Sequence, residues 1–191
     1  MRTLFLLRHS LTEATERRQY CGSSDLPLSP KGLALAENCK ARRPLPRCDL
    51  YLSSGMRRAT ETLECLYERA PDGVIGEFRE MDFGEFELKS HDQLSEDPCY
   101  QDWISDASGE IRCPGGESRS AFLERTRRGA DRLLSMRWDT ACVVCHGGVI
   151  VRLMKRWFPE ASRNFYEWQP MPCDGYVVFF EGRRPVGFEN I

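Results

Sequence analysis

Short apolar runs alternate with amphipathic stretches along the chain. Five runs have the length and composition of buried strands, at positions 3–7, 49–52, 73–78, 140–145 and 175–180. Apolar residues three and four positions apart predict helices, over 30–40, 56–69, 122–134 and 149–158. Strands that alternate with helices favour an α/β fold, a three-layer α/β/α sandwich with a mostly parallel central sheet.

Residues 88–117 are the least regular part of the chain. This segment contains two prolines and three glycines, and its pattern indicates short helices around Gln93 and Trp103. Irregular insertions often contact substrates, so we expect a lid here. The chain has no internal repeat, low-complexity tract or linker, and we therefore expect a single domain over residues 1–191.

The charge balance argues against large anionic partners. Twenty-seven Lys and Arg against 29 Asp and Glu leave a formal net charge of -2, without the basic field that a nucleic-acid or membrane-surface binder needs. No apolar run approaches the roughly 20 residues that span a bilayer. The N-terminus also lacks the cleavage site of a secretory signal. We expect a cytoplasmic protein, monomer or homodimer, that binds a small molecule and neither nucleic acid nor membrane.

The nine cysteines do not suggest a disulfide framework. Their odd number, spread along a chain of ordinary size, indicates mostly free thiols. Cys142 and Cys145 lie in a predicted strand, where residues three apart point to opposite faces. No second cysteine pair follows at ligand spacing, so a redox or zinc role for this pair is the less favoured alternative. We expect no metal and no cofactor.

Reactive or anion-binding side chains follow four of the predicted strands. Arg8 and His9 end the first run, the segment 53–58 follows the second, Glu80 follows the third and His146 the fourth. Ligands of open α/β sheets gather at the carboxyl ends of the strands. A single histidine after a strand would be weak evidence for a functional site. Such residues at the ends of four strands together predict one functional site.

The same positions carry a set of motifs. Arg8-His9-Ser10-Leu11-Thr12 resembles the Arg-His-Gly-x-Thr signature of the histidine phosphatase superfamily, the phosphoglycerate mutase-like proteins. Further segments are similar to motifs of that superfamily and follow in its order, at 21–32, 53–62, 114–118 and 146–148. The resemblance covers nearly the whole chain and implies a phosphoglycerate mutase-like fold.

The resemblance implies a role for each residue of the site. His9 would be the nucleophile, because an unprotonated imidazole can attack phosphorus and form a phosphohistidine. Arg8 and Arg58 would bind the phosphoryl oxygens through paired guanidinium donors. His146 would donate a further hydrogen bond as charge develops. This scheme needs no metal ion, since the arginines and histidine supply the positive charge.

The leaving group needs a proton, and Glu80 matches the family's acid position in its Leu-x-Glu-x-x-x-Gly segment. The same carboxylate could afterwards activate the water that cleaves phosphohistidine. Glu85 is the alternative acid in this segment. The resemblance also places Gly22 and Gly147 beside the bound phosphate.

Some positions depart from the family or stay without a role. Ser10 replaces the usual glycine, Thr15 stands where many members have asparagine, and Cys21 replaces a common threonine, so neither Thr15 nor Cys21 is assigned a function. His91 is expected at the surface, with a substrate contact as the alternative. The basic run 125–128 is expected to be a solvated helix face.

Phosphomonoester hydrolysis is the function that the resemblance favours. Family mutases are generally longer, and the segment 84–92 resembles the corresponding region of alpha-ribazole phosphatases of cobalamin assembly. A broad-specificity sugar or nucleotide phosphatase and a phosphoglycerate mutase stay open as alternatives. A non-enzymatic pseudophosphatase that binds a phospho-ligand is a further alternative, but it would not need both a nucleophile and an acid.

Overall fold

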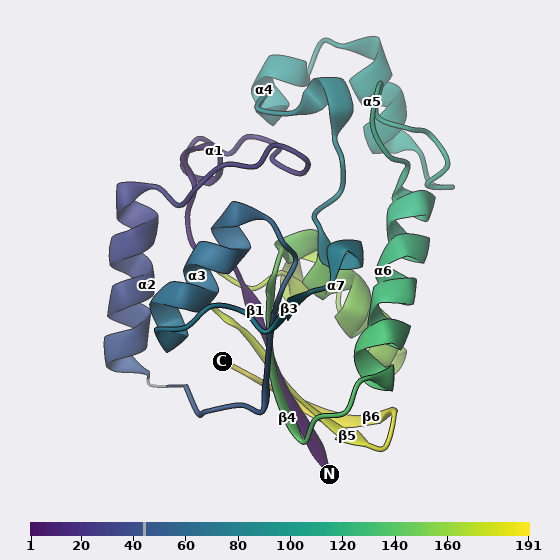
Figure 1. Ribbon diagram of the computed structural model, residues 1–191. Coiled ribbons are helices and arrows are strands. Elements are labelled where there is room, and N and C mark those ends of the chain that lie inside the picture. The colour runs from purple at the N-terminus through teal and green to yellow at the C-terminus, as the bar shows by residue number, and fades with distance from the viewer. Residues whose placement is uncertain (44) are drawn as a thin grey trace.

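A mixed β-sheet lies at the centre of the molecule (Figure 1). The computed structural model describes residues 1–43 and 45–191, and its strands are β1 (Arg2–Arg8), β2 (Leu50–Ser53), β3 (Gly73–Val74), β4 (Thr140–Cys145), β5 (Gly175–Glu181) and β6 (Arg184–Asn190). Their order is β3-β2-β4-β1-β5-β6. Strands β3, β2, β4 and β1 pair in parallel, whereas β5 and β6 add an antiparallel edge. The predicted α/β fold with a mostly parallel sheet is confirmed.

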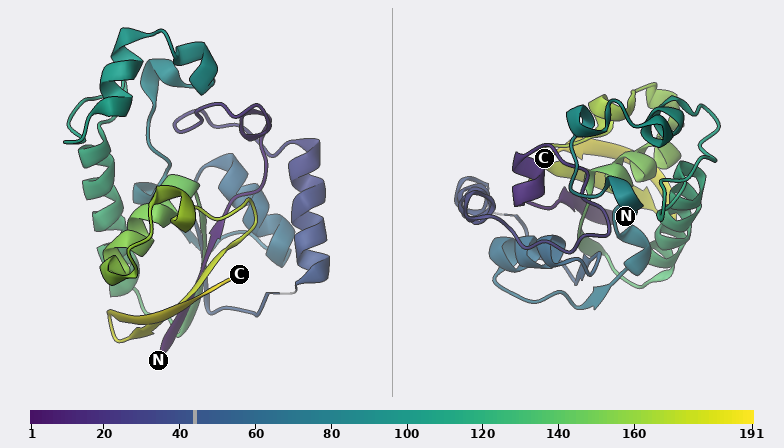
Figure 2. Two further views of the ribbon diagram at one scale, coloured as in Figure 1. Left: turned by 180° about the vertical axis from the view of Figure 1, so that it is seen from behind. Right: turned by 90° about the horizontal axis from the view of Figure 1, so that it is seen from above.

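Helices cover both faces of this sheet (Figure 2). The longer helices are α2 (Pro30–Arg42), α3 (Arg57–Tyr67), α6 (Arg119–Ser135) and α7 (Gly147–Trp157). One core cluster joins α3 to the sheet and includes Cys142, while the other joins α6 and α7 to it and includes Cys145. The two thiols therefore lie on opposite faces, as predicted, and the cysteines are free. Among the described residues, no helix has the length and apolarity to cross a membrane.

The third strand is shorter than its apolar pattern predicts. The pattern extends over 73–78, but β3 ends at Val74 and a 3-10 turn, η1 (Gly76–Phe78), follows. The N–H of Ile75 makes the next hydrogen bond to the sheet, at 3.0 Å from the Ser53 carbonyl oxygen. Phe78 is fully buried. Its side chain therefore packs into the core from a turn, which an apolar pattern cannot distinguish from a strand.

The sequence pattern does not predict β6. This strand contains Pro185 and Gly187, residues that disfavour strands, and it pairs only with β5 at the sheet edge, where proline is tolerated. Short helical turns are also absent from the prediction, because single turns have no apolar period. Besides the 3-10 turns near positions 77 and 85, they are α1 (Glu13–Glu16), η3 (Pro159–Ala161) and α8 (Phe165–Trp168).

The insertion 88–117 lies above the carboxyl ends of the parallel strands (Figure 1). It contains α4 (His91–Leu94) and α5 (Pro98–Ser105), at the two predicted positions, and is preceded by the 3-10 turn η2 (Gly84–Phe86). Ser90 caps α4 and Asp97 caps α5 through side-chain oxygens that accept backbone N–H groups. Capping allows such short helices to form without an extended apolar face.

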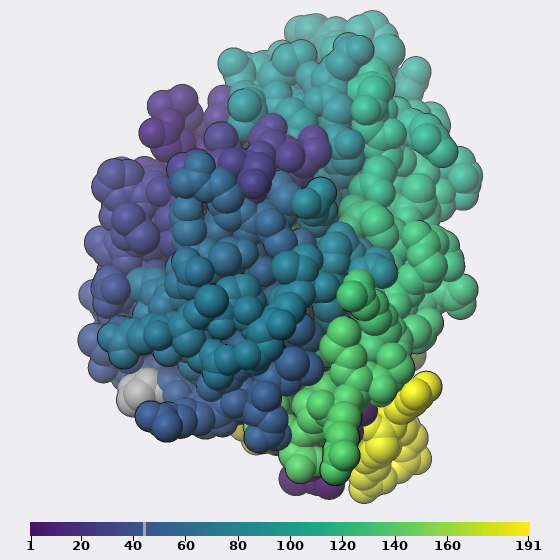
Figure 3. Space-filling view, in the orientation of Figure 1, coloured from purple at the N-terminus to yellow at the C-terminus, as the bar shows by residue number. Residues whose placement is uncertain are grey.

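The insertion is docked on the loop that follows β1. The Tyr20 hydroxyl hydrogen-bonds to that of Tyr100 (2.7 Å), and the Tyr20 and Trp103 rings meet edge to face at 5.8 Å between centroids. Backbone hydrogen bonds join Tyr20 to Leu88 and Lys89. In the space-filling view the purple N-terminal loop lies directly against the teal insertion (Figure 3). These contacts place residues 88–117 beside the strand ends.

Packing of α3 on the sheet gives the first prediction. Leu63 is fully buried in the cluster beneath α3, so Leu63→Ala should lower the free energy of unfolding by about 2–5 kcal/mol. Leu33→Ala in α2 is the matched control, because Leu33 is 48% exposed and its truncation should cost about 0.5 kcal/mol or less. Urea denaturation measures both values, and equal losses would contradict this packing.

Candidate active site

His9 and His146 follow the ends of two neighbouring strands. Arg8 at the end of β1 pairs with Cys145 at the end of β4, and the His9 N–H donates to the Cys145 carbonyl (2.9 Å). The two imidazole rings are therefore adjacent, with 5.1 Å between their centroids, and both are buried. The parallel pairing of β1 with β4 thus brings together two histidines that are far apart in the sequence.

The hydrogen bonds of His9 define its reactive nitrogen. Nδ1 lies 2.6 Å from the Ser10 carbonyl oxygen, and a carbonyl can only accept, so Nδ1 carries the proton and Nε2 has the free lone pair. Burial, followed by the charges of Arg58 and Arg8, lowers the pKa of His9 well below its ordinary value and outweighs the opposing Ser10 carbonyl. His9 is therefore neutral near pH 7 and able to act as a nucleophile.

Arg58 lies fully buried beneath the loop that contains Gly22. Its Nη1 donates to the Ser24 carbonyl (2.8 Å) and its Nη2 to the carbonyls of Gly22 (2.9 Å) and Cys21 (3.3 Å), while Nε lies 3.3 Å from His146 Nδ1. These contacts use Nε–H, one Nη1–H and both Nη2–H, which leaves the second Nη1–H for a ligand. Arg58 thus organises the loop as well as the expected phosphate site.

The contact with Arg58 also determines the tautomer of His146. Nδ1 accepts from the guanidinium, so Nε2 carries the proton and donates to the Ser54 hydroxyl (2.8 Å). Burial and then the Arg58 charge lower the pKa of His146 well below its ordinary value. The Nε2–H of neutral His146 is therefore engaged by Ser54. To donate to a phosphoryl oxygen, this N–H would have to turn away from Ser54 or be shared between the two oxygens.

Arg8 lies beside the start of α7. Its Nη1 donates to the Pro170 carbonyl (2.8 Å), and its Nε is buried with no hydrogen-bond partner among residues 1–43 and 45–191. Gly147, the first residue of α7, lies against Arg8 and Gln169, and a side chain there would come within 2.6 Å of Gln169. A glycine at this position keeps open the space beside Arg8 Nε, which a Cβ there would approach to 3.4 Å.

Glu80 reaches the same helix start from η1. Its Oε2 accepts from the Gly148 N–H (2.9 Å), one of the N-terminal donors of α7 that lack a partner within the helix. A Cβ at position 148 would lie 2.4 Å from Glu80 Oε1, so only glycine allows this approach. The structure therefore places the expected acid at the same helix terminus that follows His146.

Glu87 is a functional candidate that sequence reasoning missed. Its carboxylate accepts from the N–H groups of Gly22 (2.9 Å), Ser23 (2.9 Å) and Ser24 (3.2 Å), and also from that of Phe83. The loop at 22–24 is consequently held by Arg58 through its carbonyls and by Glu87 through its amides. The acidic Gly-Glu-Phe-Glu segment was the available signal, but nothing in it marked Glu87 above its neighbours.

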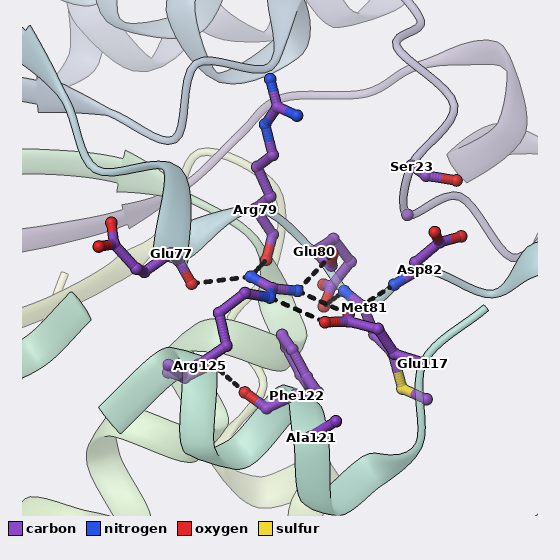
Figure 4. Close-up of polar contacts among 12 residues, drawn as sticks. Ser23, Glu77, Arg79, Glu80, Met81, Asp82, Glu117, Ala121, Phe122 and Arg125 are labelled. Carbon is purple, nitrogen blue, oxygen red and sulfur yellow. Dashed lines mark hydrogen bonds and ion pairs between the residues drawn. The ribbon is translucent and has the colours of Figure 1, made fainter. Parts of the chain in front are cut away.

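The prediction that the basic run 125–128 forms a solvated helix face is wrong for Arg125. Arg127 and Arg128 are exposed and pair with Glu124, but the Arg125 side chain is only 19% exposed. Arg125 points into the segment that carries Glu80 (Figure 4), and hydrogen-bonds to its backbone and to Glu117. Helical spacing alone could not separate Arg125 from the exposed arginines.

Four other residues discussed in the sequence analysis have side chains without a hydrogen bond to His9 or His146 among the described residues. Glu85 is exposed on η2, so the structure does not bring the alternative acid to the histidines. His91 is exposed, and its Nδ1 hydrogen-bonds to the Tyr100 hydroxyl (2.7 Å). Thr15 contacts the Thr12 hydroxyl at the start of α1, and Ser10 joins β1 to α2 through the Gly32 carbonyl (2.7 Å).

A groove adjoins the site between α2 and the residues before β5. It has a volume of about 610 Å³ and mostly apolar walls, and its lining includes Arg8, Thr15, Leu35, Met171 and Pro172. Because Arg8 contributes both to the groove and to the cationic site, a ligand held at Arg8 has an apolar space within reach.

The fold and the site define a class of α/β proteins with a cationic, histidine-centred pocket at the carboxyl ends of parallel strands. This chain belongs to the histidine phosphatase superfamily, whose branch 1 model matches residues 4–187. The adenosylcobalamin/alpha-ribazole phosphatase of Salmonella typhimurium is 30% identical over 188 residues, which cover 92% of this chain and 93% of that protein.

Solved structures give the same grouping. The alpha-ribazole phosphatase of Shigella flexneri superposes with a TM-score of 0.83 at 27% identity, covering 96% of this chain and 93% of that one. A phosphoglycerate mutase from Thermus thermophilus superposes with a TM-score of 0.74 at 30% identity, with 97% of each chain covered. The superfamily and fold that the sequence motifs implied are confirmed.

The neutral histidines give a prediction for stability against pH. In the unfolded chain histidine binds a proton below about pH 6.5, but folded His9 and His146 do so only at lower pH. The unfolded state then binds more protons, so stability is lost as pH falls, by up to about 1.4 kcal/mol per pH unit for each histidine. His9→Asn should reduce this slope in urea denaturation between about pH 6.5 and 5. His91→Asn, at an exposed position, is the control; equal slopes for wild type and His9→Asn would contradict the assignment.

Proposed function

We propose that this protein is a metal-independent phosphomonoesterase that hydrolyses alpha-ribazole 5'-phosphate through a phosphohistidine at His9. The observation that carries this proposal is the state of His9. Its Nε2 is unprotonated, its Nδ1–H is held by the Ser10 carbonyl, and the ring is buried beside two arginines. A neutral, oriented imidazole in a cationic pocket is suited to attack on phosphorus.

The first step transfers the phosphoryl group to the enzyme. The His9 Nε2 lone pair forms the N–P bond while the P–O ester bond breaks, and the leaving oxygen takes the proton of the Glu80 carboxyl group. Arg8 Nε, which has no partner among the described residues, and the remaining Nη1–H of Arg58 would donate to the transferred oxygens. Both arginines are fixed before substrate binds, so little reorganisation accompanies the reaction.

The second step releases phosphate. The Glu80 carboxylate takes a proton from water, the water oxygen bonds to phosphorus, and the N–P electron pair returns to His9 Nε2. Inorganic phosphate leaves, and both side chains regain their initial protonation states. The Gly148 N–H keeps the carboxylate at the helix terminus throughout.

Two observations support alpha-ribazole 5'-phosphate as the substrate. Relatives that cover most of this chain are named alpha-ribazole phosphatases, in sequence and in structure. The groove beside Arg8 is lined by apolar side chains that include Leu35 and Met171, which suits an aromatic base attached to the phosphate-bearing ribose. Phosphoglycerate mutation is the second candidate, because a phosphoglycerate mutase shares the fold over 97% of both chains.

A substrate panel tests the proposal. We expect the highest kcat/KM for alpha-ribazole 5'-phosphate among phosphoglycerates, sugar phosphates and nucleotides, with activity unchanged in EDTA. Acid quenching should trap phosphohistidine on the wild type, and His9→Ala should abolish both the trapped label and turnover. Preference for a phosphoglycerate with transfer instead of release would indicate a mutase. Absence of label and turnover would indicate a binding protein.

The acid role of Glu80 gives a separate prediction. Glu80→Gln should lower kcat/KM for alkyl phosphates by about 100-fold or more, because their leaving groups need a proton. It should affect 4-nitrophenyl phosphate much less, since nitrophenolate leaves without one. The ratio kcat/KM reports only the steps up to loss of the leaving group, so slow dephosphorylation of His9 does not affect this ratio. Glu85→Gln is the matched control. Equal losses on both substrates would contradict the acid assignment.

A further inference from the structure

Arg125 makes an unusual number of contacts with the backbone of one segment. Its guanidinium, on α6, donates to three carbonyls of the segment that leads to the acid, those of Glu77 (2.8 Å), Arg79 (2.9 Å) and Glu80 (3.2 Å) (Figure 4). These carbonyls lie in and just after η1, where the chain has left the sheet and has no regular partners. Arg125 therefore replaces the hydrogen bonds that a strand or helix would supply.

Glu117 completes this arrangement from the end of the insertion. It receives a two-point contact from Arg125, with Nε to Oε1 at 2.9 Å and Nη2 to Oε2 at 2.7 Å. Its Oε2 accepts from the Asp82 N–H (3.0 Å), and its own N–H donates to the Asp82 carbonyl (2.9 Å). Burial opposes ionisation, but the hydrogen bonds from Arg125 and the Asp82 N–H outweigh it and hold the pKa of Glu117 below its ordinary value.

Arg125 and Glu117 therefore hold the backbone on both sides of Glu80. Arg125 fixes the backbone up to and including Glu80, and Glu117 fixes Asp82, two residues further on. The Glu80 carboxylate accepts from the Gly148 N–H through Oε2 (2.9 Å) and from the Met81 N–H, within the same segment, through Oε1 (3.0 Å). The side-chain exposures of Arg125 and Glu117 are 19% and 23%, so solvent screens this contact less than it screens the exposed pairs on the same helix.

We propose that Arg125 and Glu117 are positioning residues for the general acid: the pair holds the 79–82 backbone so that the Glu80 carboxyl group meets the leaving oxygen. This inference rests on the acid role assigned to Glu80 under the proposed function. Arg125 and Glu117 act on the proton transfer only through Glu80. Displacement of a catalytic group by about 1 Å can cost about 100-fold in rate, which is enough for a residue outside the reacting atoms to control the chemistry.

A leaving-group comparison tests the inference. Arg125→Met removes the hydrogen-bond donors but keeps an unbranched side chain over Phe122. In the wild type, Arg125 Cζ lies 5.1 Å from the centroid of the Phe122 ring. We expect kcat/KM for alkyl phosphates to fall by about 10- to 100-fold, and kcat/KM for 4-nitrophenyl phosphate to change little. Inhibition by inorganic phosphate should stay unchanged, because Arg8 and Arg58 are untouched. Arg127→Met is the matched control, since Arg127 is exposed and pairs with Glu124 on the same helix.

A double variant separates positioning from a general structural role. If Arg125 acts through Glu80, adding Arg125→Met to Glu80→Gln should not widen the alkyl-to-aryl difference further. A parallel loss on alkyl and aryl substrates, or a double variant whose selectivity losses multiply, would overturn the inference and leave the acid role of Glu80 intact. If Glu80→Gln itself showed no leaving-group dependence, both the acid assignment and this inference would fail.

Milder variants keep the test decisive if Arg125→Met does not fold. Glu117→Gln preserves the size of the side chain and removes its charge, and Arg125→Lys keeps a positive charge but loses the planar, two-point contact. Both should show the alkyl-specific loss, smaller than that of Arg125→Met, while thermal unfolding shows a folded protein. Wild-type selectivity in both folded variants would overturn the inference.

Discussion

The Arg58 guanidinium is a fully buried positive charge, and no carboxylate lies within ion-pair distance of it in the part of the chain that the structure describes. An uncompensated charge in the interior is costly, and backbone carbonyl dipoles offset only part of that cost. Two properties of the site follow. The nearby histidines stay neutral, because burial and then the charge of Arg58 lower the pKa of each. A phosphoryl group bound here, as proposed, would supply the missing negative charge, so the pocket is electrostatically suited to an anionic ligand.

The two loops around this charge are stabilised in the same way. Neither the 22–24 loop nor the 79–82 segment belongs to a strand or helix, and each has its backbone groups paired by charged side chains. Arg58 and Glu87 hold the first, and Arg125, with Glu117, holds the second. Charged side chains that make several backbone hydrogen bonds give irregular segments a defined conformation. These two segments, the second of which carries Glu80, are therefore fixed without the regular hydrogen-bond pattern that usually provides rigidity.

Sequence reasoning recovers what depends on local pattern. Apolar runs located most of the strands, and the residues that follow them placed His9 and His146 at one edge of the sheet. The same strand-end pattern marked the segment 53–58 and Glu80, and motif resemblance then assigned the roles of Arg58 and Glu80. The contacts of Arg125 were not predictable, because its partners are carbonyls more than forty positions away that carry no side-chain signal. The same limit explains β6, whose pairing with β5 overrides unfavourable strand residues.

The two ends of the insertion 88–117 lie close together in the structure. Its near end adjoins η2, and the Glu85 N–H donates to the Pro114 carbonyl near its far end (2.8 Å). A chain excursion with its ends already joined can change in length and content at small entropic cost and without moving the strand ends. The length or sequence of this segment can therefore change while His9 and His146 keep their places at the strand ends. Glu117 limits such changes, because at the end of the insertion it contacts Arg125 and the Asp82 N–H, on the segment that carries Glu80.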